Sequence, residues 1–337
     1  MDMRSFVAAL PKAELHVHLV GAASVDTVLE LARRHPGRGV PTERDELARY
    51  YEFTDFAHFI TVIGALGRLV TTEADVVTLL VGLARDLAAN QVRYCEVTVT
   101  PVNLFNAGIG DEALVRALAT GKERAAAEHG VELTWIYDIP GEQGVEAGWR
   151  TINWYREHQP EHTVGFGLGG PEIGVPRGQF KPMFDLAREA GLHCVPHAGE
   201  TTGPETVWSA LLDLGAERIG HGIHSVRDPE LVSYLAEHRI PLEISPHSNL
   251  RTREVLDLAE HPLPKLLAAG VPVVLNTDDP GMFDTDLNRE YLAAHEKMGL
   301  TAKQLVDIAR TGVEVSFASD ATKAALLAEL DAVTLPG

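Results

Sequence analysis

The stretch 195–225 contains two segments, PHAGE at 196–200 and RIGHGIH at 218–224, each at the end of a short apolar run. The ends of these runs carry the imidazoles of His197 and His221 and the carboxylate of Glu200. His197 and Glu200 are three residues apart, so a metal ion held by the histidine would leave the glutamate free to move a proton nearby. Either segment alone is equally compatible with a surface loop that happens to contain histidine, so the rest of the chain decides.

Short apolar or β-branched runs alternate with longer helical patterns along the chain. We expect strands at residues 14–18, 92–97, 131–138, 163–168, 192–195, 218–221, 241–245 and 271–276. Helical patterns lie between and after them, at 24–34, 73–89, 111–128, 179–190, 204–214, 228–237, 264–269, 302–310 and 320–330. Repeated alternation of strand and helix predicts parallel strands joined by crossovers, and eight such strands close a barrel.

The expected fold class is therefore α/β, a (β/α)8 TIM barrel with extra helices over the mouth at the carboxyl ends of the strands. An open doubly wound sheet is the alternative, but it would carry a glycine-rich turn after its first strand, and none follows residues 14–18. We find no internal repeat, low-complexity tract or charge block that would suggest a second domain, so we expect one domain over residues 1–337.

The segment 54–70 does not fit a simple strand–helix repeat. Its apolar stripe is wider than one surface helix needs and consists of Phe56, Phe59, Ile60, Val62, Ile63, Leu66 and Leu69. Two interpretations compete. One is ordinary packing against the core, which we prefer, and the other is a lid whose apolar face closes over a ligand at the barrel mouth.

Charge excludes some classes of partner. The net charge is −19 at pH 7, and such an acidic chain repels nucleic-acid backbones and anionic membranes. A small neutral or cationic ligand fits this composition better.

The two cysteines and the N-terminal segment bear on the compartment. Cys95 and Cys194 both lie inside apolar runs, which favours buried reduced thiols over a disulfide and suits the cytoplasm. Residues 1–9 have no sustained apolar core, and nowhere do eighteen apolar residues follow one another. We therefore expect neither a signal peptide nor a transmembrane helix.

Titratable side chains fall at the carboxyl ends of the expected strands, which converge on one mouth in a barrel. The first strand ends in His16 and His18, which share a face because side chains in a strand alternate. His197, His221 and the pair Asp278-Asp279 follow or end later strands. Six such groups from four strands at the same end predict a metal site.

Three imidazoles and one carboxylate form a ligand set suited to zinc, with water at an open position. The candidate ligands are His16, His18, His197 and Asp278. Water held in this way loses a proton near neutral pH, which His221 would assist, while Glu200 would donate a proton to the substrate. Gly169 and Gly170 follow the fourth strand and offer no side chain to a second ion, so we expect one metal ion per chain.

Six motifs connect the chain with a known family: PKAELHVHL at 11–19, GLGGPE at 167–172, HAGE at 197–200, RIGHG at 218–222, SPHSN at 245–249 and NTDDP at 276–280. In their order and spacing they resemble the adenosine deaminase family of the amidohydrolase superfamily. The resemblance extends from Pro11 to about Tyr291. The chain lacks the Pro-Cys-x-x-Cys signature of the cytidine deaminases, whose zinc is held by cysteine.

The resemblance implies a hydrolytic deamination of a purine nucleoside by water. A metal-activated water attacks C6 of an adenine ring, Glu200 protonates N1, and ammonia leaves. The resemblance also implies that zinc is held by the four candidate ligands, that His221 assists the water, that Asp279 bonds ring N7 and that Gly170 approaches N3. A glycine suits that last position because only a bare backbone permits so close a contact.

The chain departs from the family pattern at Val20. Adenosine deaminases have an acidic residue there that binds the ribose 5′-hydroxyl, and adenine deaminases of this family have a glutamate. Valine cannot accept a hydrogen bond, so a 5′-hydroxyl beside it would be desolvated at a cost of about 1–3 kcal/mol. We therefore expect similarity to the members that act on 6-aminodeoxyfutalosine, an intermediate of menaquinone biosynthesis. The alternatives are 5′-methylthioadenosine or S-adenosylhomocysteine, and adenosine itself.

Two further features concern the substrate. Aminodeoxyfutalosine ends in a benzoate, so a cationic side chain is expected near the mouth, and Arg68, Arg150 and Arg177 are all candidates. His247 either faces the ligand or is an ordinary loop histidine. A non-catalytic nucleoside-binding barrel is the alternative from another class, but such a protein would have lost at least one metal or proton-transfer residue, and all are present.

Overall fold

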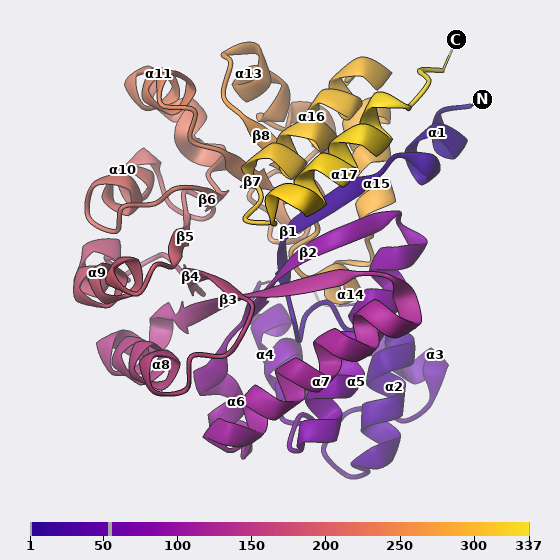
Figure 1. Ribbon diagram of the computed structural model, residues 1–337, viewed down its shortest axis with the longest axis vertical. Helices are drawn as coiled ribbons and strands as arrows, with labels where there is room; N and C mark the ends of the chain where they lie inside the picture. The colour runs from indigo at the N-terminus through magenta and orange to yellow at the C-terminus, as the bar shows by residue number, and fades with distance from the viewer. Residues whose placement is uncertain (1, 53–55, 337) are drawn as a thin grey trace.

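A closed barrel of parallel strands forms the centre of the molecule (Figure 1). The computed structural model describes residues 2–52 and 56–336, without the side chains of 56 and 57, and in this part of the chain eight strands pair in chain order. They are β1 (Lys12–His18), β2 (Val92–Val99), β3 (Glu132–Pro140), β4 (Thr163–Gly169), β5 (His193–Ala198), β6 (Ile219–His221), β7 (Leu242–Ile244) and β8 (Val273–Leu275). The predicted (β/α)8 barrel is confirmed, with the ends of the strands shifted by a few residues.

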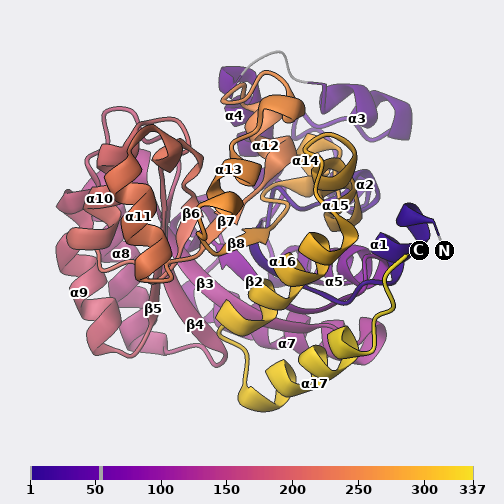
Figure 2. The ribbon, with the colours of Figure 1, turned by 90° about the horizontal axis from the view of Figure 1, so that it is seen from above.

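Helices surround the strands and also cover one end of them (Figures 1 and 2). They include α2 (Val25–Arg34), α5 (Glu73–Ala89), α7 (Asp111–His129), α8 (Gly144–His158), α9 (Lys181–Glu189), α10 (Pro204–Leu212), α11 (Pro229–Glu237), α13 (Leu263–Ala268) and α16 (Ala302–Val315). The others are α1 (Met3–Ala9), α3 (Arg44–Tyr50), α4 (Phe56–Gly67), α6 (Pro101–Ala107), α12 (Pro246–Arg251), α14 (Pro280–Phe283), α15 (Leu287–Glu296) and α17 (Asp320–Asp331). In Figure 2, α4 and α12 lie together at the top, with α3 to their right, and residues of α4 line the mouth of the barrel.

The barrel closes between β1 and β8 through a single backbone bridge, which joins Val17 to Asp278. The amide of Asp278 donates to the carbonyl of His16, and the amide of His18 donates to the carbonyl of Asp278, both at 2.9 Å. Closure therefore brings the first and the last strand together at the residues that the sequence predicts as metal ligands.

Side chains complete the same seam below this bridge. The amide of Leu15 donates to Oδ1 of Asn276 at 2.9 Å. The carboxylate of Glu14 accepts from the amide and the hydroxyl of Thr277, at 3.1 and 3.0 Å. These bonds satisfy backbone groups that a regular ladder would pair, as buried backbone polar groups require.

Helix α5 shows how local sequence fixes one wall of the barrel. Thr72 and Asp75 form a capping box at its start, which satisfies amides that have no partner inside the helix. Asp75 also accepts from Nη1 of Arg34 at 2.7 Å and lies 2.9 Å from Nε2 of His35. The carboxylate therefore ties α5 to α2 as well as capping it.

Helix α4 accounts for most of the segment 54–70. Residues 53–55 and the side chain of Phe56 lie outside the described part of the chain. Val62, Leu66 and Leu69 are buried in the core, as the core-packing interpretation expects. Another face of the same helix lines a cavity at the barrel mouth, so core packing explains only part of the stripe. Closure of this helix as a moving lid stays a prediction.

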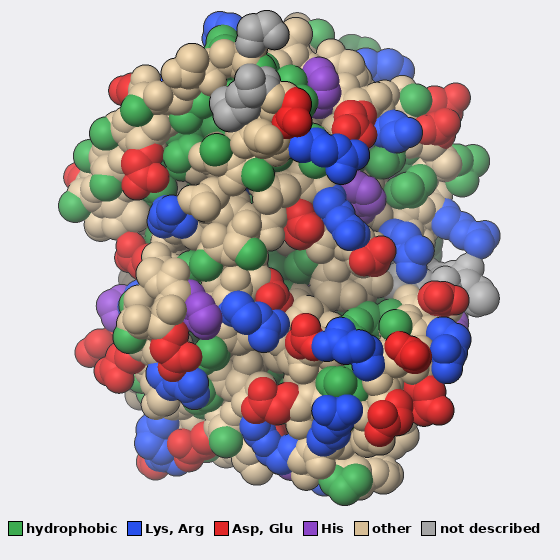
Figure 3. Space-filling view, turned by 90° about the vertical axis from the view of Figure 1, so that its right-hand side faces the viewer, with side chains coloured by type: hydrophobic (Ala, Val, Ile, Leu, Met, Phe, Trp, Pro, Cys, Tyr) green, Lys and Arg blue, Asp and Glu red, His purple; other side chains and the backbone are tan. Residues whose placement is uncertain are grey.

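Figure 3 shows the side of the molecule that lies at the right in Figure 1, and on this face acidic and basic side chains are interspersed. Cys95 and Cys194 are both buried free thiols. None of the helices in the described part of the chain combines the length and the apolar character that crossing a membrane requires.

Candidate active site

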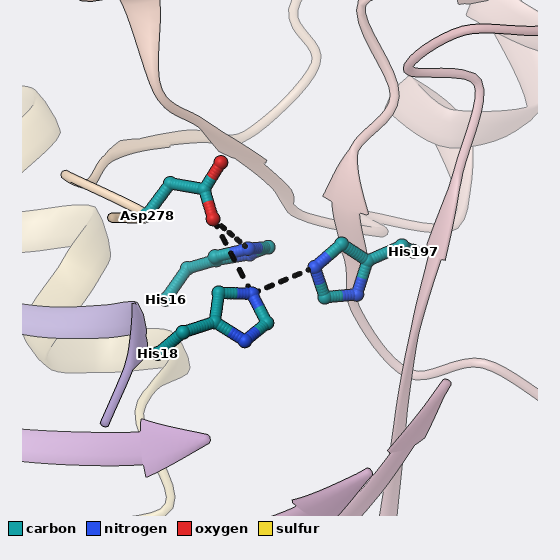
Figure 4. Close-up of side chains that lie close together, drawn as sticks. All are labelled: His16, His18, His197 and Asp278. Atoms are coloured by element: carbon teal, nitrogen blue, oxygen red, sulfur yellow. Dashed lines mark hydrogen bonds and ion pairs between the residues drawn. The ribbon is translucent and has the colours of Figure 1, made fainter. Parts of the chain in front are cut away.

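The four predicted metal ligands lie together at the carboxyl ends of the strands (Figure 4). His16 and His18 belong to β1, His197 belongs to β5, and Asp278 follows β8. Nε2 of His18 is 3.1 Å from Nε2 of His197 and 3.3 Å from Oδ1 of Asp278. Nε2 of His16 is 3.6 Å from the same carboxylate oxygen.

These separations would allow one metal ion to contact all four side chains. Two donor atoms that each lie about 2.0–2.2 Å from the same zinc ion can be at most about 4.4 Å apart, and the three separations above are shorter than that. Nε2 of His16 is buried and has no hydrogen-bond partner in the described part of the chain. A buried polar atom without a partner is costly, and a metal ion at this point would satisfy it.

His16 is held by a buried series of charged side chains on the side away from the other candidate ligands. Nδ1 of His16 is 3.0 Å from Oε2 of Glu243, which leaves Nε2 of His16 directed at the other candidate ligands. Oε1 of Glu243 accepts from Nε of Arg218 at 2.6 Å, and Arg218 also pairs with Glu96. Burial raises the pKa of Glu243, but the Arg218 charge and the His16 contact outweigh it and lower the pKa below its usual range. An ionised Glu243 selects the tautomer of His16 that a metal ion needs.

Asp278 and His221 both occupy the left-handed region of the backbone, with φ of 64° in each. Residues other than glycine rarely adopt this conformation, and when they do they are often at functional sites. Oδ2 of Asp278 accepts a hydrogen bond from the hydroxyl of Ser248 at 2.7 Å. The carboxylate is therefore fixed both by its backbone and by a neighbouring side chain.

The negative charges near this cluster favour the binding of a cation. Burial lowers the pKa of His16, but Asp278 and Glu243 outweigh it and raise the pKa to about 10. The two nearby carboxylates stabilise a proton on His16. A divalent cation bound at this site would replace that proton.

Glu200 and His221 stand beside the candidate ligands. Oε2 of Glu200 is 3.6 Å from Nε2 of His221, which is 3.9 Å from Oδ2 of Asp278. Burial raises the pKa of Glu200 well above its usual range, and the charge of Asp278 adds to this. Burial lowers the pKa of His221 to about 4. The protein therefore favours the protonated carboxyl and the neutral imidazole.

Glu172 holds the loop that carries Glu200. Its carboxylate accepts from the amides of Thr201 and Thr202 at 3.0 and 2.9 Å, and from the Thr202 hydroxyl at 2.6 Å. Nη2 of Arg177 lies 3.7 Å from the same carboxylate, and both side chains are fully buried. Arg177 thus belongs to the support of this loop.

Asp279 and Gly170 line the same cavity as His18, His197 and Asp278. A Cβ on Gly21 would lie 1.5 Å from Oδ1 of Asp279, so this carboxylate occupies the space that a side chain at 21 would need. A Cβ on Gly170, whose φ is 77°, would lie 2.3 Å from Oε2 of Glu142. Gly21 is therefore required by its close contact with the buried Asp279, whereas Gly170 is favoured by its backbone conformation, because the exposed Glu142 side chain could move aside.

The cavity at the mouth has a volume of about 610 Å³, within the range of small-molecule sites. Val20 and Arg68 line it. His247 is not among the residues found to line it, and its Nδ1 lies 2.9 Å from Oε2 of Glu290. Arg150 pairs with Asp111 on the outside of the barrel. Of the three arginines that the sequence left open, Arg68 is the one found in the cavity wall.

Sequence reasoning missed three carboxylates near the site, of which Glu243 and Asp138 are buried and Glu142 is exposed. Glu243 supports His16, and Asp138 and Glu142 line the cavity. Glu243 and Asp138 each stand in a strand among apolar neighbours. A lone carboxylate in a buried strand is rare unless it has a partner, and this signal could have singled them out. Glu142 lies in a short 3-10 helix, η1 (Gly141–Gln143), and has no comparable signal.

Comparison with known proteins agrees with the site. The sequence profile of the adenosine deaminase family matches residues 11–333. An aminodeoxyfutalosine deaminase of Streptomyces avermitilis is 53% identical over 335 residues, which cover 99% of this chain and 94% of that protein. A protein of the same name from Streptomyces coelicolor is 52% identical, over 99% of this chain and 87% of its own length.

Solved structures are similar over most of the chain. The crystal structure of an adenine deaminase from Arthrobacter aurescens has a TM-score of 0.91 at 30% identity, covering 96% of this chain and 98% of that one. An amidohydrolase from Burkholderia ambifaria, solved with bound zinc, has a TM-score of 0.90 at 28% identity and covers 98% of this chain and 93% of that one. The chain belongs to the adenosine deaminase family and is a hydrolytic deaminase.

Proposed function

We propose that this deaminase uses one zinc ion to remove the 6-amino group of aminodeoxyfutalosine, which gives futalosine and ammonia. The observation that carries the proposal is the convergence of the candidate metal ligands, Glu200 and Asp279 on one cavity whose wall includes the apolar Val20. Relatives that are 52–53% identical over nearly the whole chain have the name aminodeoxyfutalosine deaminase. We also propose that the protein is located in the cytoplasm.

In this proposal His16, His18, His197 and Asp278 hold the metal, which fits their separations and the unpaired Nε2 of His16. When bound, zinc supplies a Lewis acid that lowers the pKa of water towards neutrality. The zinc in the similar amidohydrolase structure supports the choice of ion.

Two groups of the chain would move protons. His221 is neutral at pH 7 because burial lowers its pKa to about 4, so its free imidazole can accept a proton from the attacking water. Glu200 lies 3.6 Å from His221 and has a raised pKa because it is buried. A carboxyl that keeps its proton can donate it to N1 of the purine ring as C6 becomes tetrahedral.

Two further groups would orient the ring. Asp279 is buried, its Oδ1 has no hydrogen-bond partner in the described part of the chain, and burial raises its pKa. It can therefore donate a hydrogen bond to N7. The bare backbone of Gly170 borders the cavity and would approach N3. Together they would fix which carbon of the ring faces the candidate ligands.

Val20 supports the choice of substrate at the 5′ end. Its side chain lines the cavity two residues beyond the candidate ligand His18, and it offers no acceptor for a 5′-hydroxyl. Aminodeoxyfutalosine has a carbon substituent at this position, so it loses no hydrogen bond there. We expect kcat/KM for aminodeoxyfutalosine to exceed that for adenosine by about tenfold or more, the scale of one unmet hydrogen bond.

The test compares the two substrates in the wild type and in Val20→Asp. Aspartate would restore an acceptor for the hydroxyl and would place a charge against the larger substituent, so the ratio of the two kcat/KM values should fall or invert. 5′-Methylthioadenosine is the control, because it lacks the hydroxyl and also the benzoate. A wild type that prefers adenosine, with the ratio unchanged in Val20→Asp, would refute the proposed substrate.

A further inference from the structure

Arg68 is the cationic exception in an acidic cavity. Among the described lining residues it is the one lysine or arginine, whereas five lining residues are acidic: Asp138, Glu142, Glu200, Asp278 and Asp279. Arg68 is therefore the place in the described lining where an anionic group of a ligand would meet the permanent charge of a guanidinium. The side chain of Arg68 is exposed, and in the described part of the chain no carboxylate lies within 4.0 Å of its guanidinium.

The other candidate arginines are already paired. Arg150 pairs with Asp111 and lies over the ring of Phe105. Arg177 is buried beside Glu172. Neither of these arginines is among the described residues that line the cavity, whereas Arg68 is, and its charge is available to a ligand there.

The helix surface beside Arg68 is bare. Gly64 and Gly67 line the cavity on the same helix. A Cβ on Gly67 would meet no described atom within 4 Å, and a Cβ on Gly64 would meet only Nη1 of Arg68, at 3.6 Å. Gly64 lies inside α4, where a glycine costs about 1 kcal/mol relative to alanine, and Gly67 is the last residue of the helix. Neither glycine is required here by crowding. They leave open space along the cavity wall up to the guanidinium.

Apolar side chains border this bare surface. Phe59, Ile60 and Ile63 of α4 also line the cavity, and Ile60 is 43% exposed although it is a large apolar residue. A ligand group that fits this wall is flat and apolar, lies over the two glycines and ends in an anion at Arg68.

We propose that Arg68 is a specificity-determining residue that binds a carboxylate at the far end of the substrate. In this proposal Gly64 and Gly67 form the surface against which the flat group between this carboxylate and the ribose packs. This inference rests on the proposed function, because the benzoate of aminodeoxyfutalosine is such a group. A guanidinium binds a carboxylate through two parallel hydrogen bonds, which a lysine ammonium cannot reproduce.

The experiment compares aminodeoxyfutalosine with its methyl ester, which keeps the ring and loses the charge. In Arg68→Gln we expect the ratio of kcat/KM for the acid to that for the ester to fall by about 10- to 100-fold relative to the wild type. The change should appear mainly in KM, because the carboxylate is bound equally in the ground state and the transition state. Arg68→Lys should give an intermediate ratio.

Arg150→Gln is the matched control, since it removes the same charge on the outside of the barrel, and it should keep the wild-type ratio. Gly67→Val should reduce kcat/KM for the acid and the ester alike while affecting 5′-methylthioadenosine less, because the added side chain would fill the space in which the flat group packs.

The outcomes separate the two proposals. A wild type that deaminates neither the acid nor the ester would overturn the proposed function, and this inference with it. A wild type that deaminates the acid, together with an Arg68→Gln variant whose acid-to-ester ratio is unchanged, would overturn this inference alone. Equal losses on both substrates in Arg68→Gln would give the residue a purely structural role and would overturn it as well.

Discussion

Replacing Glu243 by glutamine should weaken metal binding although Glu243 is not itself a candidate ligand. Its two carboxylate oxygens contact Nδ1 of His16 and Nε of Arg218, at 3.0 and 2.6 Å. A glutamine has one oxygen and one amide nitrogen. Because Arg218 can only donate, the glutamine oxygen would face Arg218 and its NH2 would face Nδ1 of His16. That contact favours the tautomer with the proton on Nε2, the atom that a metal ion needs.

The expected magnitude follows from this contact. Restoring the correct tautomer in Glu243→Gln would leave two donors facing each other in a buried place, which costs about 1–3 kcal/mol. Loss of such a partner behind a ligand typically lowers metal affinity by about 10- to 100-fold, which corresponds to about 1.4–2.7 kcal/mol. The metal-free protein should also lose stability, because Arg218 would keep Glu96 as its one charged partner among the described residues.

The assay is a zinc titration of metal-free protein in competition with a chromophoric chelator. Glu217→Gln is the matched control, because Glu217 lies 2.8 Å from Nδ1 of His193 in a similar pair that is about half exposed. The control should bind zinc as the wild type does. Thermal unfolding of both forms of each variant would show whether the stabilisation by zinc shrinks as its affinity falls.

An unchanged zinc Kd in Glu243→Gln, together with a lower Tm of the metal-free protein, would refute this reasoning. It would mean that Glu243 stabilises the barrel without selecting the tautomer of His16.

Three further predictions follow from the structure. Glu200→Gln should keep zinc and the fold but lower kcat by about two to four orders of magnitude, whereas retained activity with a lower Tm would make Glu200 a structural carboxylate. Gly21→Ala should lower kcat/KM and leave the zinc content intact, because the new Cβ would displace the carboxylate of Asp279, and full activity in this variant would contradict the contact. Asp75→Asn should destabilise the protein at pH 7. Burial raises the pKa of Asp75, but its histidine and arginine partners outweigh it and lower the pKa to about 2. The stabilisation is thus present above the usual value of 3.8 and is lost as the pH falls to about 2. Urea unfolding of both proteins across this pH range should show the difference disappearing, and a difference independent of pH would rule the ion pairs out as its cause.

The barrel could be predicted from the sequence because its signal is local. Each strand is a short apolar run and each helix a longer periodic one, so eight alternations limit the topology to few choices. The strand with the least regular signal is β5, which continues through Pro196 to Ala198. Its predicted end at residue 195 was too early, because proline is unusual inside a strand.

The candidate site was also predictable, for a geometric reason. Residues at the carboxyl ends of parallel strands converge in any closed barrel, so position in a strand was sufficient to group His16, His197 and Asp278. Their shared location needed no knowledge of distances. The sequence therefore determined the fold class and the type of chemistry.

Only the tertiary structure decided the partners of each side chain. Glu243 meets His16 across 227 residues of chain, and His247, a candidate for ligand contact, lies against Glu290. Arg68 lines the cavity while Arg150 points away from it. Such contacts depend on the direction of long side chains from separate elements, and composition and periodicity carry no information about that direction. The sequence by itself thus determined which groups the mouth of the barrel contains, and the packing of the elements around that mouth decided which of them support a ligand and which face the substrate.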